Sequence, residues 1–74
     1  MTLKVINMEK TRGSNVLYTI LDLGEGSVMG RAIVHYGKRK SWWRFITRSG
    51  RKIRNKDTIA RMTDAIGRYH DATN

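Results

Sequence analysis

The chain has 74 residues and no cysteine, so we expect a single domain without disulfides or thiolate metal sites. Its apolar runs are far shorter than the ~20 residues that span a bilayer, and charge interrupts the first residues in a way that is untypical of a signal peptide. The net charge of +9 favours a negatively charged partner. We expect no membrane association, no cofactor and no small-molecule substrate.

The N-terminal half predicts two strands and their turns. Residues 3–8 are rich in β-branched and apolar side chains, and residues 9–15 read as a polar turn around a glycine. Residues 16–23 carry apolar side chains at both parities, which is typical of a central strand. The two glycines within residues 24–27 then predict a hairpin loop.

Residues 28–36 predict a third strand, because apolar and polar side chains alternate along most of it. Simple alternation places Val28 and Ala32 on its core face and Met29 on the opposite face. Residues 37–40 form the next turn.

Residues 41–47 predict a fourth strand, in which adjacent tryptophans must point to opposite faces. Trp43 shares its parity with Phe45, and we expect it to lie in the core. Trp42 shares its face with Arg44 and is the candidate contact residue. The alternative is that both tryptophans are structural. Residues 52–54 follow as a short fifth strand or as a lead-in to the next element.

The C-terminal segment predicts a helix whose first turn Asn55 or Asp57 can cap. Its apolar residues recur at spacings of three and four and form one stripe: Ile59, Met62, Ala65, Ile66 and Tyr69. Asp57, Asp64 and Asp71 lie on the opposite face of this helix. The fold class expected is therefore α+β: a small, twisted antiparallel sheet, a β-meander of four or five strands, with one C-terminal helix packed on it.

The charge is concentrated in one block of the sequence. Residues 26–56 contain ten Lys or Arg and no acidic residue, whereas the segments before and after them are nearly neutral. Lys and Arg neutralise phosphate charge, and tryptophan beside arginine offers a stacking surface for unpaired bases. The candidate residues for binding a partner or nucleic acid are Lys38, Arg39, Lys40, Trp42, Arg44, Arg48, Arg51, Lys52 and Arg54.

Catalysis is not expected. No two carboxylates are spaced for acid–base chemistry, and His35 and His70 each stand alone, so both are predicted to be surface or hydrogen-bonded polar residues rather than metal ligands. The glycines at 24, 26 and 30 precede a strand instead of a helix, which argues against a phosphate-binding loop.

Several non-enzymatic interpretations stay open. The same Arg and Trp residues suit an acidic groove on another protein, and an uncovered edge strand at residues 3–8 could pair with a partner's main chain. The basic face could also serve assembly of a ribosome- or virion-associated structural protein, or simply be solvated. Major-groove reading by the helix is disfavoured, because its outer face is acidic.

In size, in lack of cysteine and in the basic stretch KRKSWWRF…RSGRKIR at residues 38–54, the chain resembles the small regulators that lytic bacteriophages direct against host transcription. It is similar in particular to those of Xanthomonas phages that bind bacterial RNA polymerase and act as initiation inhibitors and antiterminators. The resemblance implies a non-enzymatic transcription regulator in the host bacterial cytoplasm, which binds RNA polymerase and places its basic face near nucleic acid. The alternative is a protein that binds RNA or DNA directly, largely without regard to sequence.

Overall fold

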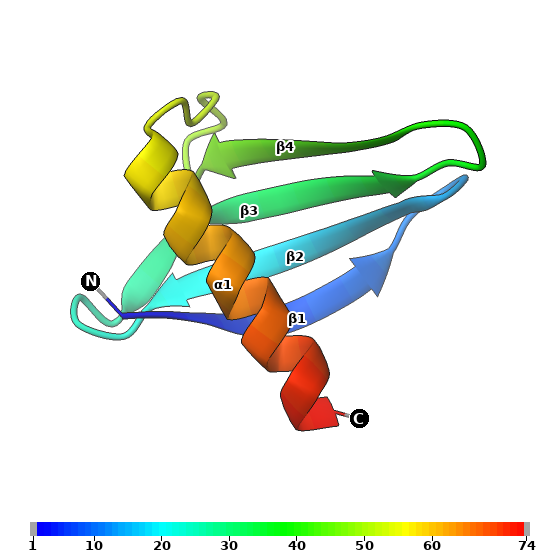
Figure 1. Ribbon diagram of the computed structural model, residues 1–74. Helices are drawn as coiled ribbons and strands as arrows, with labels where there is room; N and C mark the ends of the chain where they lie inside the picture. Colours follow the sequence, from blue (N-terminus) through cyan, green and yellow to red (C-terminus); the bar gives the residue numbers. More distant parts are fainter. Residues whose placement is uncertain (1, 74) are drawn as a thin grey trace.

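The computed structural model describes residues 2–73 as one antiparallel sheet with one helix packed across it (Figure 1). The elements are β1 (Leu3–Lys10), β2 (Asn15–Asp22), β3 (Ser27–Tyr36), β4 (Ser41–Thr47) and α1 (Lys56–Thr73). The strands lie in the order β1-β2-β3-β4, which confirms the α+β meander with a C-terminal helix. In the described range, no helix is long and apolar enough to cross a bilayer.

The loop between β2 and β3 is held by a side chain at the end of β2. The carboxylate Oδ1 of Asp22 accepts hydrogen bonds from the main-chain N–H groups of Gly24 and Glu25, at 2.9 and 3.3 Å. Aspartate commonly stabilises turns in this way. Gly26 completes the loop with φ +69°, a left-handed conformation that glycine adopts without a steric penalty.

A β-bulge in β3 changes which side chains reach the core. Ile20 pairs with Gly30, but the next residue of β2, Leu21, pairs with Val28, so Met29 is the extra residue. Met29 packs against the core and Val28 lies opposite Leu21. The alternation predicted for these two positions is therefore wrong, because a bulge adds one residue and reverses the side-chain parity beyond it.

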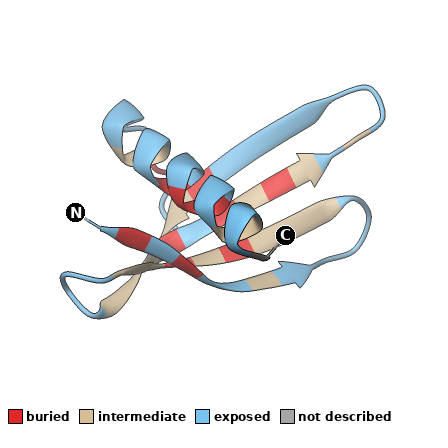
Figure 2. Ribbon diagram, turned by 60° about the horizontal axis from the view of Figure 1, so that its bottom comes forward, coloured by how far each residue is buried: buried red, intermediate tan, exposed pale blue. Residues whose placement is uncertain are grey.

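The core lies between α1 and the sheet, mainly under the crossing of the helix over β1 and β2 (Figure 1). The helix contributes the predicted stripe: Met62, Ala65 and Ile66 are buried, and Ile59 and Tyr69 pack at its margins. Figure 2 shows the buried residues gathered beneath the helix and β4 left largely exposed. The helix is therefore stabilised by tertiary packing, and it leaves much of β4 uncovered.

Of the two residues predicted to cap α1, Asn55 is the one that does so. The side-chain oxygen of Asn55 accepts a hydrogen bond from the main-chain N–H of Thr58 at 3.1 Å. Asp57 lies inside the first turn and forms an ion pair with Arg61 at 3.0 Å. Asp64 and Arg68 form a second ion pair at the same spacing. Exposed pairs of this kind contribute about 0.3–0.5 kcal/mol each.

The fifth strand does not form, and residues 52–54 are the lead-in to the helix. Lys52 makes a single antiparallel bridge with Ile46, and the N–H of Ile53 donates to the carbonyl of Phe45 at 2.8 Å. Gly50 reverses the chain with φ +92°, and the helix begins soon after at residue 56, so too few residues remain for a ladder. This segment nevertheless buries Ile53 and fixes Lys52 beside β4.

A cluster of hydrogen-bonded polar side chains lies at one end of the core. The Tyr18 side chain is only 1% exposed, and its hydroxyl lies 2.7 Å from Nε2 of His70 and 3.2 Å from the hydroxyl of Tyr36. Burial, and secondarily the hydrogen bond with Tyr36 and the nearby Tyr69, raises the pKa of Tyr18 above its ordinary value of 10.0. The neutral phenol is thus favoured in the folded state.

This raised pKa predicts a loss of stability at alkaline pH. Above about pH 10 the unfolded chain releases the Tyr18 proton while the folded chain keeps it, so the unfolded state binds fewer protons and stability falls as pH rises. The slope from this group is at most about 1.4 kcal/mol per pH unit. We expect the urea midpoint of the wild type to fall more steeply between pH 9 and pH 11, as a rough window, than that of Tyr18→Phe. Equal slopes in the two proteins would contradict this assignment.

Candidate nucleic-acid interface

The sheet face that is turned away from α1, here called the outer face, carries a mixture of apolar and basic side chains. Strand register places Ile33 of β3 directly opposite Arg44 of β4. In the next row Arg31 lies opposite Ile46, which in turn bridges to Lys52. Because paired residues point to the same face of a sheet, the three cations surround Ile33 and Ile46 on an open surface.

Trp42 forms an aromatic site on this outer face. Its ring stacks on the imidazole of His35, with centroids 5.3 Å apart and planes inclined by 14°. The guanidinium carbon of Arg44 lies 5.5 Å from the Trp42 ring centroid, within cation–π distance. Trp42 is still 40% exposed, so an aromatic ligand can reach it.

A side chain of β2 orients His35, the residue on which Trp42 stacks. Nδ1 of His35 lies 2.5 Å from the side-chain oxygen of Asn15 on β2, which makes this ring nitrogen the donor and fixes the plane of the imidazole. The prediction that His35 is a hydrogen-bonded polar residue is confirmed. A side chain at Gly37 would lie 2.8 Å from Nε2 of His35 and 2.4 Å from the carbonyl of Lys40, so glycine is needed there.

The predicted basic residues follow β4 from one end to the other. Lys38, Arg39 and Lys40 lie in the hairpin before the strand, and Arg44 lies within it. Arg48, Arg51, Lys52 and Arg54 lie in the segment that joins β4 to α1, at the opposite end of the sheet (Figure 1). We call these eight residues together with Trp42 the basic strip; all nine are exposed. The structure thus arranges the predicted residues along one edge of the sheet instead of gathering them in a pocket.

The acidic residues lie away from the basic strip. Glu9 is on β1, at the opposite edge of the sheet, and Asp22 and Glu25 are at the loop that joins β2 to β3. The helix aspartates Asp57 and Asp64 are paired with arginines of the same helix. Asp71 follows near the end of the same helix. Among the described residues no member of the basic strip forms an ion pair with a carboxylate, so its attraction for a polyanion is retained.

Sequence reasoning missed two members of this surface and misplaced a third residue. Arg31 and His35 lie outside the densest basic stretch, and only the register with β4 brings them beside Ile46 and Trp42. Trp43 was expected in the core but is 42% exposed, although it stacks on the buried ring of Phe45 at 5.8 Å. The helix packs mainly on β1 and β2 and leaves this part of the inner face uncovered.

Within residues 2–73, the structure shows no group of three or more His, Asp or Glu side chains that could hold a metal ion. What the outer face offers chemically is stacking, apolar contact and cationic hydrogen-bond donors. Comparison with models of protein families, with curated proteins and with solved structures finds no match for this chain.

Proposed function

We propose that this protein binds single-stranded nucleic acid along the outer face and the basic strip, without catalysing a reaction. One observation carries the proposal: the exposed Trp42 ring, flanked by His35 and Arg44, lies on an open sheet face in the middle of a line of cations. Base–aromatic stacking combined with a charged track is the usual means of binding single strands without sequence preference.

The two parts of the site would contact different parts of the ligand. The exposed part of the Trp42 ring can stack an unpaired base, and Ile33 and Ile46 supply the apolar surface beside it. The cations at both ends of β4 lie where the phosphates of an extended strand would pass. A duplex keeps its bases stacked on one another, so it can use the charges but not the aromatic site.

The test is fluorescence anisotropy with a labelled oligothymidine of about 15 nucleotides and a duplex of equal length, titrated from about 50 to 200 mM salt. We expect tighter binding of the single strand. If about half of the eight cations contact phosphates, log affinity should fall with log salt at a slope of roughly −3.

A matched pair of double variants locates the contact. Replacing Arg44 and Lys52 with alanine should lower the affinity about 10-fold and reduce the steepness of the slope by about 1.4, the value for two phosphate contacts on a single strand. Replacing Lys4 and Lys10 with alanine removes the same charge from β1, at the far edge of the sheet, and should leave the slope unchanged. Equal effects of the two variants, or tighter binding of the duplex, would overturn the proposal.

RNA polymerase as a docking partner, which the resemblance to phage regulators implies, stays a prediction, as does a role in the host bacterial cytoplasm. The salt titration also tests whether the protein needs RNA polymerase as a docking partner. Binding that disappears near physiological salt would mean that the basic strip acts only while another protein holds it beside nucleic acid. In that case the inhibitor or antiterminator role would be the better interpretation, and binding to purified RNA polymerase would be measured next.

A further inference from the structure

The free edge of β1 carries main-chain N–H and C=O groups that β2 does not pair. Leu23 donates its N–H to the carbonyl of Thr2 at 2.9 Å, and Leu3 and Val5 lie opposite Asp22 and Ile20. Because hydrogen-bonded and non-hydrogen-bonded pairs alternate in an antiparallel ladder, the N–H and C=O groups of Leu3 and Val5 point away from β2. They form the beginning of a template for another strand.

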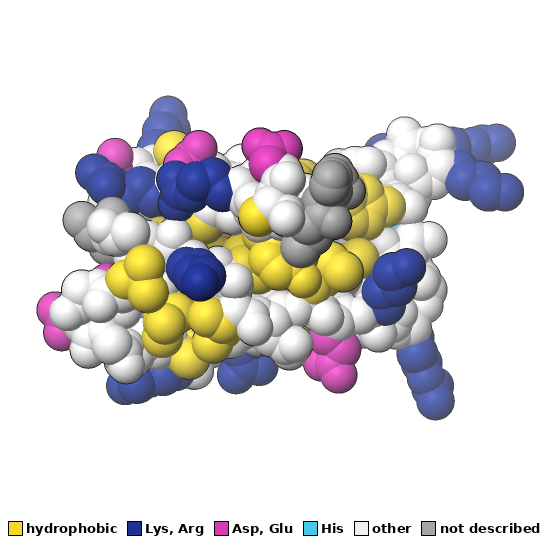
Figure 3. Space-filling model, turned by 90° about the horizontal axis from the view of Figure 1, so that it is seen from below, with side chains coloured by type: hydrophobic (Ala, Val, Ile, Leu, Met, Phe, Trp, Pro, Cys, Tyr) yellow, Lys and Arg dark blue, Asp and Glu magenta, His cyan; other side chains and the backbone are white. Residues whose placement is uncertain are grey.

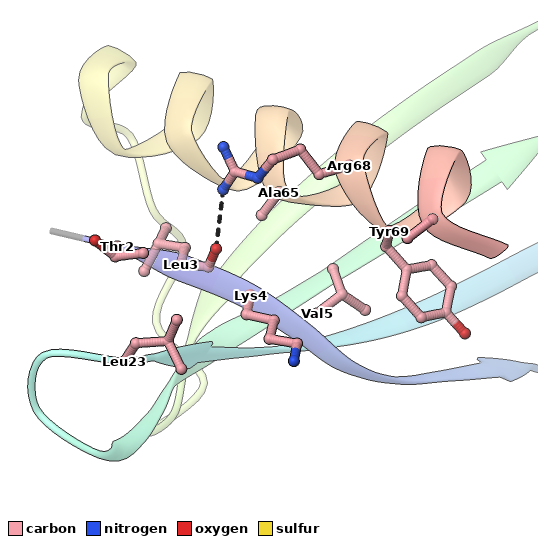
Figure 4. Close-up of a pocket in the computed structure, with 9 residues that line it drawn as sticks. Thr2, Leu3, Lys4, Val5, Leu23, Ala65, Arg68 and Tyr69 are labelled. Carbon is pink, nitrogen blue, oxygen red and sulfur yellow. Dashed lines mark hydrogen bonds between the residues drawn. The ribbon is translucent and has the colours of Figure 1, made fainter.

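A groove of about 460 Å³ lies beside this edge, between β1 and the C-terminal half of α1 (Figure 4). Its apolar lining comes from both elements and from the loop after β2: Leu3, Val5, Leu23, Ala65, Tyr69 and Ala72. Leu23 is 50% exposed, so its side chain can be reached by a ligand in the groove. Figure 3, which views the molecule from the β1 side, shows hydrophobic side chains gathered along this seam with Lys or Arg among them.

Two cationic side chains, Lys4 and Arg68, line the groove, and Arg68 is paired with Asp64 of the same helix. The guanidinium of Arg68 also donates from Nη2 to the outward carbonyl of Leu3 at 3.0 Å (Figure 4). This bond shows that the free edge is accessible to a donor that comes from outside the sheet. A carbonyl oxygen has two lone pairs, so the Leu3 carbonyl can accept from a second donor as well.

We propose that β1 and this groove bind an extended peptide segment of another protein, which adds a fifth strand to the sheet, inserts an apolar side chain into the groove and places an acidic side chain against Lys4. Strand addition supplies affinity through main-chain hydrogen bonds and specificity through side-chain pockets. Here the outward groups of Leu3 and Val5 meet the first requirement and the groove meets the second.

Charge argues for an acidic partner over a second copy of this chain. A second copy would bring another Lys4 to the seam, whereas an acidic side chain would neutralise the Lys4 that is already there. A compact apolar ligand could fill the groove, but it would leave the edge N–H groups of Leu3 and Val5 without partners. This surface is on the opposite edge of the sheet from β4, so it is separate from the basic strip.

The probe is a synthetic peptide of about seven residues in which glutamate alternates with leucine or valine, the pattern that a strand with one acidic and one apolar face requires. We expect binding to the full chain, seen as chemical-shift changes and slowed hydrogen exchange at the amides of Leu3 and Val5. A peptide with lysine in place of glutamate should not bind. The acidic peptide with N-methyl groups on the alternate amides that face β1 should lose binding as well, because it cannot donate to the edge.

Matched variants separate this surface from the basic strip. Lys4→Glu and Leu23→Glu should each lower peptide affinity about fivefold or more, while Lys10→Glu, the same charge change on the same strand outside the groove, should have little effect. The Arg44 and Lys52 double variant should keep full peptide affinity. Loss of binding in that variant would place the peptide on the basic strip and overturn the inference. A dimer of the free protein that Lys4→Glu dissociates, or binding that survives N-methylation, would overturn it too.

Discussion

Replacing Trp42 with alanine is expected to weaken binding to single-stranded oligonucleotide roughly 5- to 150-fold, while duplex binding changes little. Loss of one base–aromatic stack costs about 1–3 kcal/mol, which corresponds to that range of affinity. The same substitution also removes the surface on which His35 and Arg44 are arranged. Anisotropy at constant salt measures the effect, and the salt slope should stay nearly constant because no cation is lost.

The neighbouring tryptophan supplies an internal control. Trp43 is as exposed as Trp42, at 42% against 40%, but it points to the opposite face of the same strand and stacks on Phe45. Trp43→Ala should therefore leave the affinity unchanged, provided that circular dichroism shows the variant to be folded at the temperature of the titration. Trp42→Phe should recover most of the binding, since a smaller ring still stacks. If Trp43→Ala weakened binding as much as Trp42→Ala, nucleic acid would not lie on the outer face.

The largest effect on stability is expected at Gly30, where β3 approaches β4 too closely for any side chain. A Cβ at this position would lie 2.2 Å from the carbonyl oxygen of Ile46 and 3.3 Å from Cα of Thr47. These are main-chain atoms of the adjacent strand, so relief requires the strands to separate. Gly30→Ala should destabilise the fold by about 3 kcal/mol, the upper part of the range for overpacking, and lower Tm by roughly 12–24 °C. Gly30→Val should prevent folding altogether.

The control for this prediction is the same substitution on the helix. Gly67 is exposed in the middle of α1, and a Cβ there meets nothing within 4 Å. Gly67→Ala should raise stability by about 1 kcal/mol, since alanine is the better helix former. Thermal unfolding followed by circular dichroism compares the two, and opposite signs are expected. A Gly30→Ala protein within about 1 kcal/mol of the wild type would mean that β3 and β4 adjust without cost.

The architecture of this protein can be predicted from its sequence, because the signals concerned are local. Runs of apolar and β-branched residues predicted the first two strands, and alternation between residues 28 and 47 predicted the next two. Glycines predicted turns and one apolar stripe predicted α1, and Asn55 was among the two expected caps. The acid-free block likewise located the basic strip, since charge adds up along the chain without knowledge of the fold. Local periodicity predicts correctly which face a side chain lies on where that face depends only on the residue's own strand or helix.

Which surfaces of the sheet are open depends instead on how the helix and the strands pack together. A bulge exchanged the faces of Val28 and Met29, and no local pattern reveals an inserted residue. Trp43 has the parity of a core residue, yet it is exposed because α1 packs mainly on β1 and β2 and leaves it uncovered. The His35–Trp42 stack, the pairing of Arg31 with Ile46 and the groove beside β1 join residues that are far apart in sequence. Such contacts depend on strand register and on the path of the helix, which are properties of the assembled sheet and not of any single segment.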